Sequence, residues 1–399
     1  MIDRRTLLKT GAAALTATLA SRTAFAQNGG DINVGVVLPL TGASAQFGIN
    51  SRNGLELAVD RLNSSGGIKS MGGARIKLIV ADATSAPTAA ATAAQRLISQ
   101  NEVVAVIGAY VSSLTLAVSE VLERRGIPLL TISYADQLTE RGFKNVFRIN
   151  PKASALGRAQ VDACIDISAD SGRKLERVAI VYEDTAYGTS QSAGLRAACK
   201  EKNLSIVMDE AYPQGITDVT PLINKLRAAD AQVLFPVSYL NDTLQIVRSM
   251  RQQQVQVPVV GGAGGFILPE FGQSLGEFAE GVLSVNSSNY DLDPESAKLY
   301  RDRYNYPMVH DAIEHAALIE ILAQTLEKTK SSAASDLRAA MTETRFEGGW
   351  INGMPGGAID FDETGHNTLA VPIIIQWKGG EQATVWPKQF EKVSPTWTN

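Results

Sequence analysis

Three hydroxyl side chains follow a short apolar run in the first third of the chain. The run VVAVIG (103–108) has the composition of a buried strand, and Ser112, Ser113 and Thr115 stand where a helical pattern begins. The first amides of a helix have no partner within the helix, and the helix dipole places partial positive charge beside them. Amides and hydroxyls arranged in this way stabilise an anion such as a carboxylate. A plain helix cap uses the same residue types, so these residues alone leave both interpretations open.

Motifs that would indicate catalysis are weak. GQSLG (272–276) matches the GxSxG nucleophile motif, but Pro269 interrupts the strand that this motif requires. His310 and His315 are five residues apart, unlike the histidines of an HExxH zinc site, and we expect them to be exposed or to cap helices. The Gly-rich VVGGAGGF (259–266) fits neither a dinucleotide nor a phosphate-loop motif. We therefore expect a protein that is not an enzyme and needs no cofactor or metal.

The N-terminus has the pattern of an export signal. DRRTLLK (3–9) resembles the twin-arginine signature through Arg4 and Arg5, and a weakly apolar run then leads to AFA before Gln27. That run is about half of the ~20 apolar residues that a membrane span requires. We therefore expect residues 1–26 to be a signal peptide and the mature chain to be a soluble periplasmic protein.

Composition and charge exclude several kinds of partner. The chain has 399 residues, 45% hydrophobic and 20% charged, with a formal net charge of −4. Because no long run of one sign occurs, we expect no binding to nucleic acid or to an anionic membrane. The length favours two domains. Cys164 and Cys199 both lie in helical patterns, and the sequence leaves open whether they form a disulfide.

Short apolar runs alternate with amphipathic helical patterns along the chain. One round of this alternation covers residues 32–133 and a second covers about 151–262, followed by helices and by a last pair of strands near 371–387. This order is typical of an α/β fold with two doubly wound, parallel-sheet lobes. Ligands of such sheets bind outside the carboxyl ends of the strands, so we expect a cleft between the lobes.

Six segments, in this order, resemble a known family. They are GVVLPLTGASAQFG, GLELAVDRLNSSGGI, VVAVIGAYVSSLTLAVSEV, IPLLTIS, AYG after VAIVYED, and AIDFDETG. The resemblance is to periplasmic solute-binding proteins of the leucine/isoleucine/valine-binding type, which are receptors of ABC importers, and it spans nearly the whole mature chain. It implies three crossings between the lobes, near Asn150, near Ser284 to Asn289 and near Gly356 to Asp360. The implied division is lobe one at 27–150 and 285–356, and lobe two at 151–284 and 357–399.

The resemblance also implies where a ligand carboxylate binds. In that family a serine after the third strand and small residues after the fourth strand hold the carboxylate. The corresponding positions here are Ser112 or Ser113 and the backbone amides of Ala135 and Asp136. With the resemblance, the carboxylate site becomes the favoured interpretation of the hydroxyls after the strand.

Aromatic positions of the family correspond to three residues of this chain. Phe47 in AQFG stands where a ring of lobe one packs on the ligand, although core packing explains it equally well. Tyr187 in TAYG and Tyr239 in PVSYLND stand where rings of lobe two close over the ligand. A tyrosine suits such a cleft because it supplies both apolar area and a hydroxyl.

At one position this chain lacks an acidic residue that the family has. The amino-acid binders of the family hold the ligand ammonium with an acidic residue, and Ala263 in GGAGG stands at that place. An ammonium buried without an anion would cost several kcal/mol. Either Asp136 takes this role, or the ligand has no ammonium, as in aromatic or other organic acids and amides.

The expected function is therefore capture of a small carboxylate-bearing solute between the lobes of a periplasmic monomer. Ligand contacts made only in the closed form would bias a hinge motion, and the closed form would dock on an ABC permease in the inner membrane. Two other classes remain as alternatives, a sensor of the same fold that reports to a signalling partner, and an exported α/β enzyme.

Overall fold

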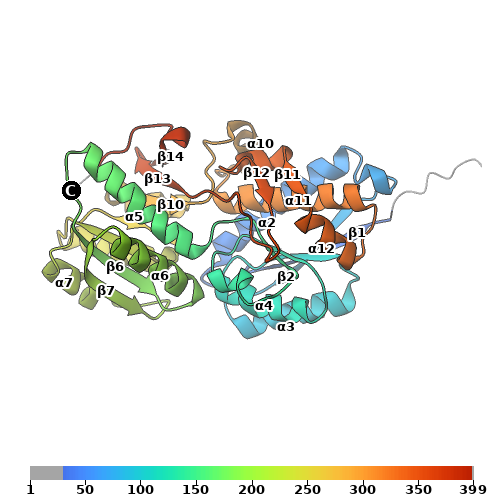
Figure 1. Cartoon of the computed structure of the whole chain (residues 1–399), viewed down its shortest axis with the longest axis horizontal. Coiled ribbons are helices and arrows are strands. Elements are labelled where there is room, and N and C mark those ends of the chain that lie inside the picture. The colour runs from blue at the N-terminus through green and yellow to red at the C-terminus, as the bar shows by residue number, and fades with distance from the viewer. Residues whose placement is uncertain (1–29, 398–399) are drawn as a thin grey trace, which may run out of the picture.

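Two α/β lobes lie side by side in residues 30–397, the part of the chain that the computed structural model describes (Figure 1). The export signal expected at 1–26 lies outside these residues. Lobe one contains the first strands of the chain, and lobe two contains the middle of the chain and its last strands. The expected α/β fold class is confirmed.

Lobe one is built on a parallel sheet with the strand order β2-β1-β3-β4-β5. Its strands are β1 (Ile32–Leu38), β2 (Ile76–Asp82), β3 (Ala105–Gly108), β4 (Leu129–Thr131) and β5 (Val146–Arg148). Helices cover both faces, and for this reason the inner strands are continuous apolar runs. The helices are α2 (Ala45–Ser64), α3 (Pro87–Gln100), α4 (Ser112–Glu123), α10 (Pro294–Tyr304), α11 (His310–Thr329) and α12 (Ala334–Thr342). The pair α2 and α11 and the pair α3 and α4 lie on opposite sides of the sheet (Figure 1).

Lobe two has a mixed sheet, where the sequence pattern predicted a parallel one. Its strands are β6 (Arg177–Glu183), β7 (Ser205–Tyr212), β8 (Val233–Val237), β9 (Val260–Gly261), β10 (Leu283–Asn286), β13 (Ile373–Lys378) and β14 (Glu381–Trp386). The parallel group β7-β6-β8 connects to β9 through a bridge between Leu234 and Val259. β13 and β14 run antiparallel because Gly379 and Gly380, with φ of 60° and 82°, form a hairpin turn between them.

The helices of lobe two pack mainly on that sheet. They are α5 (Ala153–Asp170), α6 (Ala186–Glu201), α7 (Thr220–Ala228), α8 (Leu240–Gln252) and α9 (Pro269–Leu275). α5 and α6 approach each other closely, since a Cβ on Gly194 would lie 2.1 Å from the carbonyl oxygen of Ser154. Cys164 on α5 and Cys199 on α6 are both buried and free, and burial raises the pKa of Cys199 to about 12. The cysteines therefore do not form the disulfide that the sequence left open.

The chain passes between the lobes three times in the described residues. The first passage, 149–152, joins β5 to α5, and the second, 287–293, joins β10 to α10. The third lies later than the expected Gly356 to Asp360, because β12 (Ala358–Asp360) pairs with β11 (Arg345–Glu347) inside lobe one. His366 also bridges to β5 at Arg148, so this passage follows Asn367.

Glycines explain the displaced third passage. Gly348, Gly349 and Gly357 have positive φ and make turns within lobe one, where the sequence pattern favoured a linker.

The remaining short elements are 3-10 helices: η1 (Lys69–Met71), η2 (Asp136–Thr139), η3 (Gly264–Phe266), η4 (Gly276–Ala279), η5 (Gly349–Gly353) and η6 (Lys388–Phe390).

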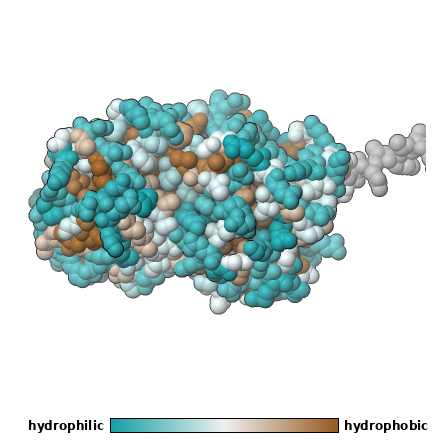
Figure 2. Space-filling view, viewed as in Figure 1, coloured by the Kyte–Doolittle hydropathy of each residue, from teal (hydrophilic) through white to brown (hydrophobic). Residues whose placement is uncertain are grey.

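The outer surface is largely hydrophilic on the face seen in Figure 2, with hydrophobic residues gathered in small groups, mostly on lobe two. Among residues 30–397, no helix combines the length and the apolar character that crossing a membrane requires. Nor do the described residues bring together three or more His, Cys, Asp or Glu side chains in a way that could hold a metal ion.

Candidate functional site

A cluster of aromatic rings joins the two lobes. Phe47 on α2 stacks on Tyr110, which precedes α4, with ring centroids 4.6 Å apart. Tyr239, at the start of α8 in lobe two, meets Phe47 edge-on at 6.2 Å and Tyr187 of α6 at 5.4 Å. Tyr134, after β4, lies 6.0 Å from Tyr187. All five rings are buried, so the structure has the lobes closed on each other.

The four tyrosines of this cluster line a small cavity at the carboxyl ends of the strands, whereas Phe47 packs behind Tyr110 and does not line it. Its lining residues come from both lobes and are Tyr110, Ser112, Ile132, Tyr134, Tyr187, Tyr239 and Gly264. None of them is charged at neutral pH, since burial raises the pKa of each of these tyrosines well above its ordinary value. The cavity measures about 10 Å³, which is room for about one water molecule. An organic ligand therefore requires the rings to separate.

The N-terminus of α4 forms the polar end of this cavity. Ser112 is the first residue of α4, and its buried hydroxyl accepts a hydrogen bond from the amide of Ala135 at 3.2 Å. The Tyr239 hydroxyl, from the other lobe, hydrogen-bonds to the backbone of Ser112. The geometry thus brings together three of the predicted site residues at amides that have no partner within the helix, where an anion is stabilised.

Two of the predicted hydroxyls face elsewhere. Ser113 lines a second and larger chamber of about 220 Å³, here called the outer chamber, together with Tyr239 and Asp242. The Thr115 hydroxyl, predicted as a further donor, accepts from the amide of Ala109 at 3.0 Å and bonds to Ser133 at 2.6 Å. Thr115 therefore holds the loop before α4 in place and does not reach the cavity.

Neither Asp136, the possible partner of a ligand ammonium, nor Ala263, which stands where the family has its acidic residue, lines the cavity. The Asp136 carboxylate accepts a hydrogen bond from the amide of Ser154 at 3.1 Å and so caps the start of α5. Ala263 is buried with φ of 60°, and its amide donates to the Ser284 hydroxyl at 3.1 Å. Its neighbour Gly264 lines the cavity in its place.

A family model described as periplasmic binding protein matches residues 31–382. The chain belongs to this family. It is 29% identical over 371 residues to Leu/Ile/Val-binding protein homolog 7 of Brucella melitensis, an alignment that covers 90% of this chain and 92% of the relative. The resemblance inferred from the six sequence segments is thereby confirmed.

Solved structures show the same fold as this periplasmic binding protein. The branched-chain amino acid transporter substrate-binding protein LivJ of Streptococcus pneumoniae, in complex with isoleucine, superposes with a TM-score of 0.78 at 24% identity, covering 90% of this chain and all of that one. An ABC transporter solute-binding protein of R. palustris, in complex with benzoate, superposes with a TM-score of 0.75 at 21% identity, covering 89% of this chain and 95% of that one.

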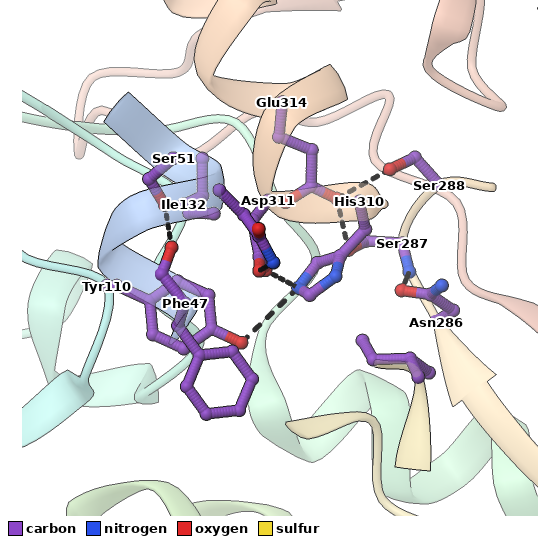
Figure 3. Close-up of polar contacts among 12 residues, drawn as sticks. Phe47, Ser51, Tyr110, Ile132, Asn286, Ser287, Ser288, His310, Asp311 and Glu314 are labelled. Atoms are coloured by element: carbon purple, nitrogen blue, oxygen red, sulfur yellow. Dashed lines mark hydrogen bonds and ion pairs between the residues drawn. The ribbon is translucent and has the colours of Figure 1, made fainter. Parts of the chain in front are cut away.

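Behind the aromatic rings, this periplasmic binding protein has a buried polar cluster at the start of α11 (Figure 3). His310 and His315 are both buried, which corrects the expectation that they are exposed or cap helices. His310 Nε2 lies 2.8 Å from Asp311 Oδ1 and 3.5 Å from the Tyr110 hydroxyl. Although burial disfavours the His310 cation, Asp311 and Glu314 raise its pKa above the ordinary value. Burial lowers the pKa of His315 to about 4, so that ring is neutral.

Several residues that line or support the cavity were not predicted from the sequence. Tyr134 stands directly beside Ala135, so adjacency to a predicted site residue was an available signal. Tyr110 has φ of 66°, a strained conformation that is characteristic of functional loops but is visible only in the structure. A larger surface hollow of about 390 Å³, beside Arg61 and Trp350, lies on lobe one and shares no residue with this site.

Proposed function

We propose that this protein is the periplasmic receptor of an ABC importer and that it captures a small carboxylate-bearing solute between its lobes. The observation that carries the proposal is the meeting of the Ser112 hydroxyl and the Ala135 amide at the N-terminus of α4, under aromatic rings from both lobes. Such a site offers hydrogen bonds and positive potential to a carboxylate and apolar faces to the rest of the ligand.

Capture would begin on lobe one in an open form. The ligand carboxylate would take the place that the Tyr239 hydroxyl holds beside the Ser112 backbone, while its body packs against Phe47 and Tyr110. Tyr187 and Tyr239 would then close over it from lobe two. Closure is favoured because these contacts exist only in the closed form. The closed form would dock on a permease in the inner membrane.

The charge distribution favours an acid without an ammonium group. No lining residue of the cavity carries a negative charge, Ala263 is neutral, and the Asp136 carboxylate caps α5. An ammonium buried beside the carboxylate would lack an anionic partner and lose several kcal/mol. Similar proteins have been solved with isoleucine and with benzoate, and the uncharged, tyrosine-rich cavity of this chain favours the second type of ligand.

We further propose that residues 1–26 direct export by the twin-arginine route, as DRRTLLK suggests. Replacing both Arg4 and Arg5 with Lys tests this. Export of the double variant at the wild-type level would contradict the twin-arginine assignment.

Thermal melting of the mature, ligand-stripped protein tests the proposed function. The panel contains benzoate, 4-hydroxybenzoate, phenylpyruvate, isoleucine and phenylalanine, each beside its primary amide. A ligand that binds only the folded state stabilises it by RT ln(1 + [L]/Kd), about 4 kcal/mol at 1,000-fold over Kd. We expect the aromatic acids to raise the melting temperature and their amides to leave it unchanged. Equal shifts with acids and amides, or shifts with amino acids alone, would contradict the proposed ligand class.

A further inference from the structure

One buried carboxylate accepts hydrogen bonds from two of the passages between the lobes. Glu314, on α11 of lobe one, has no solvent exposure. Its Oε2 accepts a hydrogen bond from Asn150 Nδ2 at 2.8 Å, in the first passage. Its Oε1 accepts from the hydroxyls of Ser287 at 2.5 Å and Ser288 at 3.0 Å, in the second passage (Figure 3).

This arrangement matches an ionised carboxylate. Three donors point at the two oxygens of Glu314, and a protonated carboxyl would set its own hydrogen against one of them. Burial raises the pKa of Glu314 above its ordinary value, and His310 and the three donors reduce this rise without cancelling it.

The carboxylate also fixes the direction of a hydrogen bond that reaches the ligand cavity. Ser287 lies 2.7 Å from the Tyr134 hydroxyl, and the distance alone does not say which group donates. A carboxylate can only accept, so the single hydroxyl hydrogen of Ser287 is used on Glu314. Tyr134 must therefore donate to Ser287, and its oxygen retains only lone pairs for any ligand.

We propose that Glu314 is a positioning residue for ligand capture. It limits the hinge motion because its hydrogen bonds hold the first and second passages to α11. It also leaves Tyr134 able only to accept a hydrogen bond from a ligand in the cavity. The hinge part stands independently of the ligand, whereas the second part deepens the proposed function and rests on it. The second part predicts that the ligand carries a hydrogen-bond donor, such as a hydroxyl, in addition to its carboxylate.

The hinge part is tested without any ligand, by spin-label distance measurement. Labels on Thr88→Cys in lobe one and Thr217→Cys in lobe two report the opening, because both positions are exposed and lie close in sequence to residues that line the outer chamber. The native thiols of Cys164 and Cys199 are buried and do not compete for the label. We expect Glu314→Gln to lengthen the mean distance and to broaden its distribution.

Glu320→Gln is the matched control for this measurement. Glu320 is on the same helix and half-buried, and its hydrogen bond is to Gln324 of that helix and not to a passage. If Glu314→Gln does not fold, Ser287→Ala takes its place as the test variant, because it removes one hydrogen bond to Glu314 and leaves the carboxylate in place. A folded Glu314→Gln or Ser287→Ala with the wild-type distance distribution would overturn the hinge part.

The selectivity part is tested with 4-hydroxybenzoate, 3-hydroxybenzoate and benzoate as probes. The wild type should bind the better hydroxy acid about 3- to 10-fold more tightly than benzoate, as expected for one net hydrogen bond. In Ser287→Ala the Tyr134 hydroxyl regains a free hydrogen, and this preference should shrink. An unchanged preference in Ser287→Ala would refute the role of Glu314 in selectivity. If none of the probes binds, the proposed ligand class and the selectivity part fail together, and the spin-label distances still decide the hinge part.

Discussion

Ser112→Ala is the substitution that separates a ligand site from a plain helix cap. In the wild type the Ser112 hydroxyl is the acceptor for the buried amide of Ala135 at 3.2 Å. Removing that acceptor leaves a buried donor unpaired, which costs about 1–3 kcal/mol. At about 2–4 °C per kcal/mol for domains of 150–250 residues, we expect the melting temperature of the ligand-free protein to fall by several degrees.

Ser113→Ala is the matched control, because it makes the same chemical change one position along α4. Ser113 is half-buried and faces the outer chamber. We expect the free energy of unfolding of Ser113→Ala to stay within about 0.5 kcal/mol of the wild type. The sequence could not choose between these two serines, so the comparison tests the structure directly.

The two variants should also differ in binding, measured by titration calorimetry with the acid that shifts the melting temperature most. A charge-assisted hydrogen bond contributes about 1.5–3 kcal/mol, so loss of the Ser112 hydroxyl should raise Kd by about 10- to 100-fold. Ser113→Ala should leave Kd nearly unchanged. If Ser113→Ala weakens binding more than Ser112→Ala, the assignment of the carboxylate site to Ser112 is wrong.

Three further predictions follow from other parts of the structure. Gly54→Ala would place a Cβ 2.3 Å from a backbone oxygen of α11, so chemical denaturation should show a loss of about 1–3 kcal/mol or more, while Gly30→Ala, with nothing within 4 Å, should be neutral. The pKa of His315 falls from 6.5 to about 4 on folding, so its neutral form contributes stability that is complete above pH 6.5 and is lost as the pH falls to about 4. That loss amounts to at most about 3 kcal/mol, and His315→Gln should reduce the slope of stability against pH in this window. A thiol reagent should modify neither Cys164 nor Cys199 in the folded protein and both after unfolding, because both thiols are buried; rapid modification of the native protein would contradict their placement.

The fold could be predicted from the sequence because its signals are local. Buried parallel strands such as β3 are continuous apolar runs, and the helices between them have a clear apolar stripe. The third passage was misplaced because glycines such as Gly348 and Gly357 occur both in linkers and in tight turns. Only the pairing of β12 with β11 distinguishes the two cases, and that contact is between distant parts of the chain.

The site was predictable only in part, because residue types at strand ends do not fix the direction of side chains. Ser112, Ala135, Tyr187 and Tyr239 meet in the structure, while Asp136 turns to cap α5. The burial of the polar residues of α11 was not predicted, because nothing local shows that a charged residue such as Glu314 is buried. Its partners come from two passages that lie 164 and 27 residues away in sequence, and their positions depend on the complete fold.

The most direct test of the central claim is a crystal structure of the mature protein with the acid that stabilises it most. We expect the ligand to lie between the lobes, with its carboxylate within hydrogen-bond distance of the Ser112 hydroxyl and the Ala135 amide and its body between Phe47 and Tyr187. A carboxylate directed to solvent, or a ligand bound outside the interlobe cleft, would contradict it.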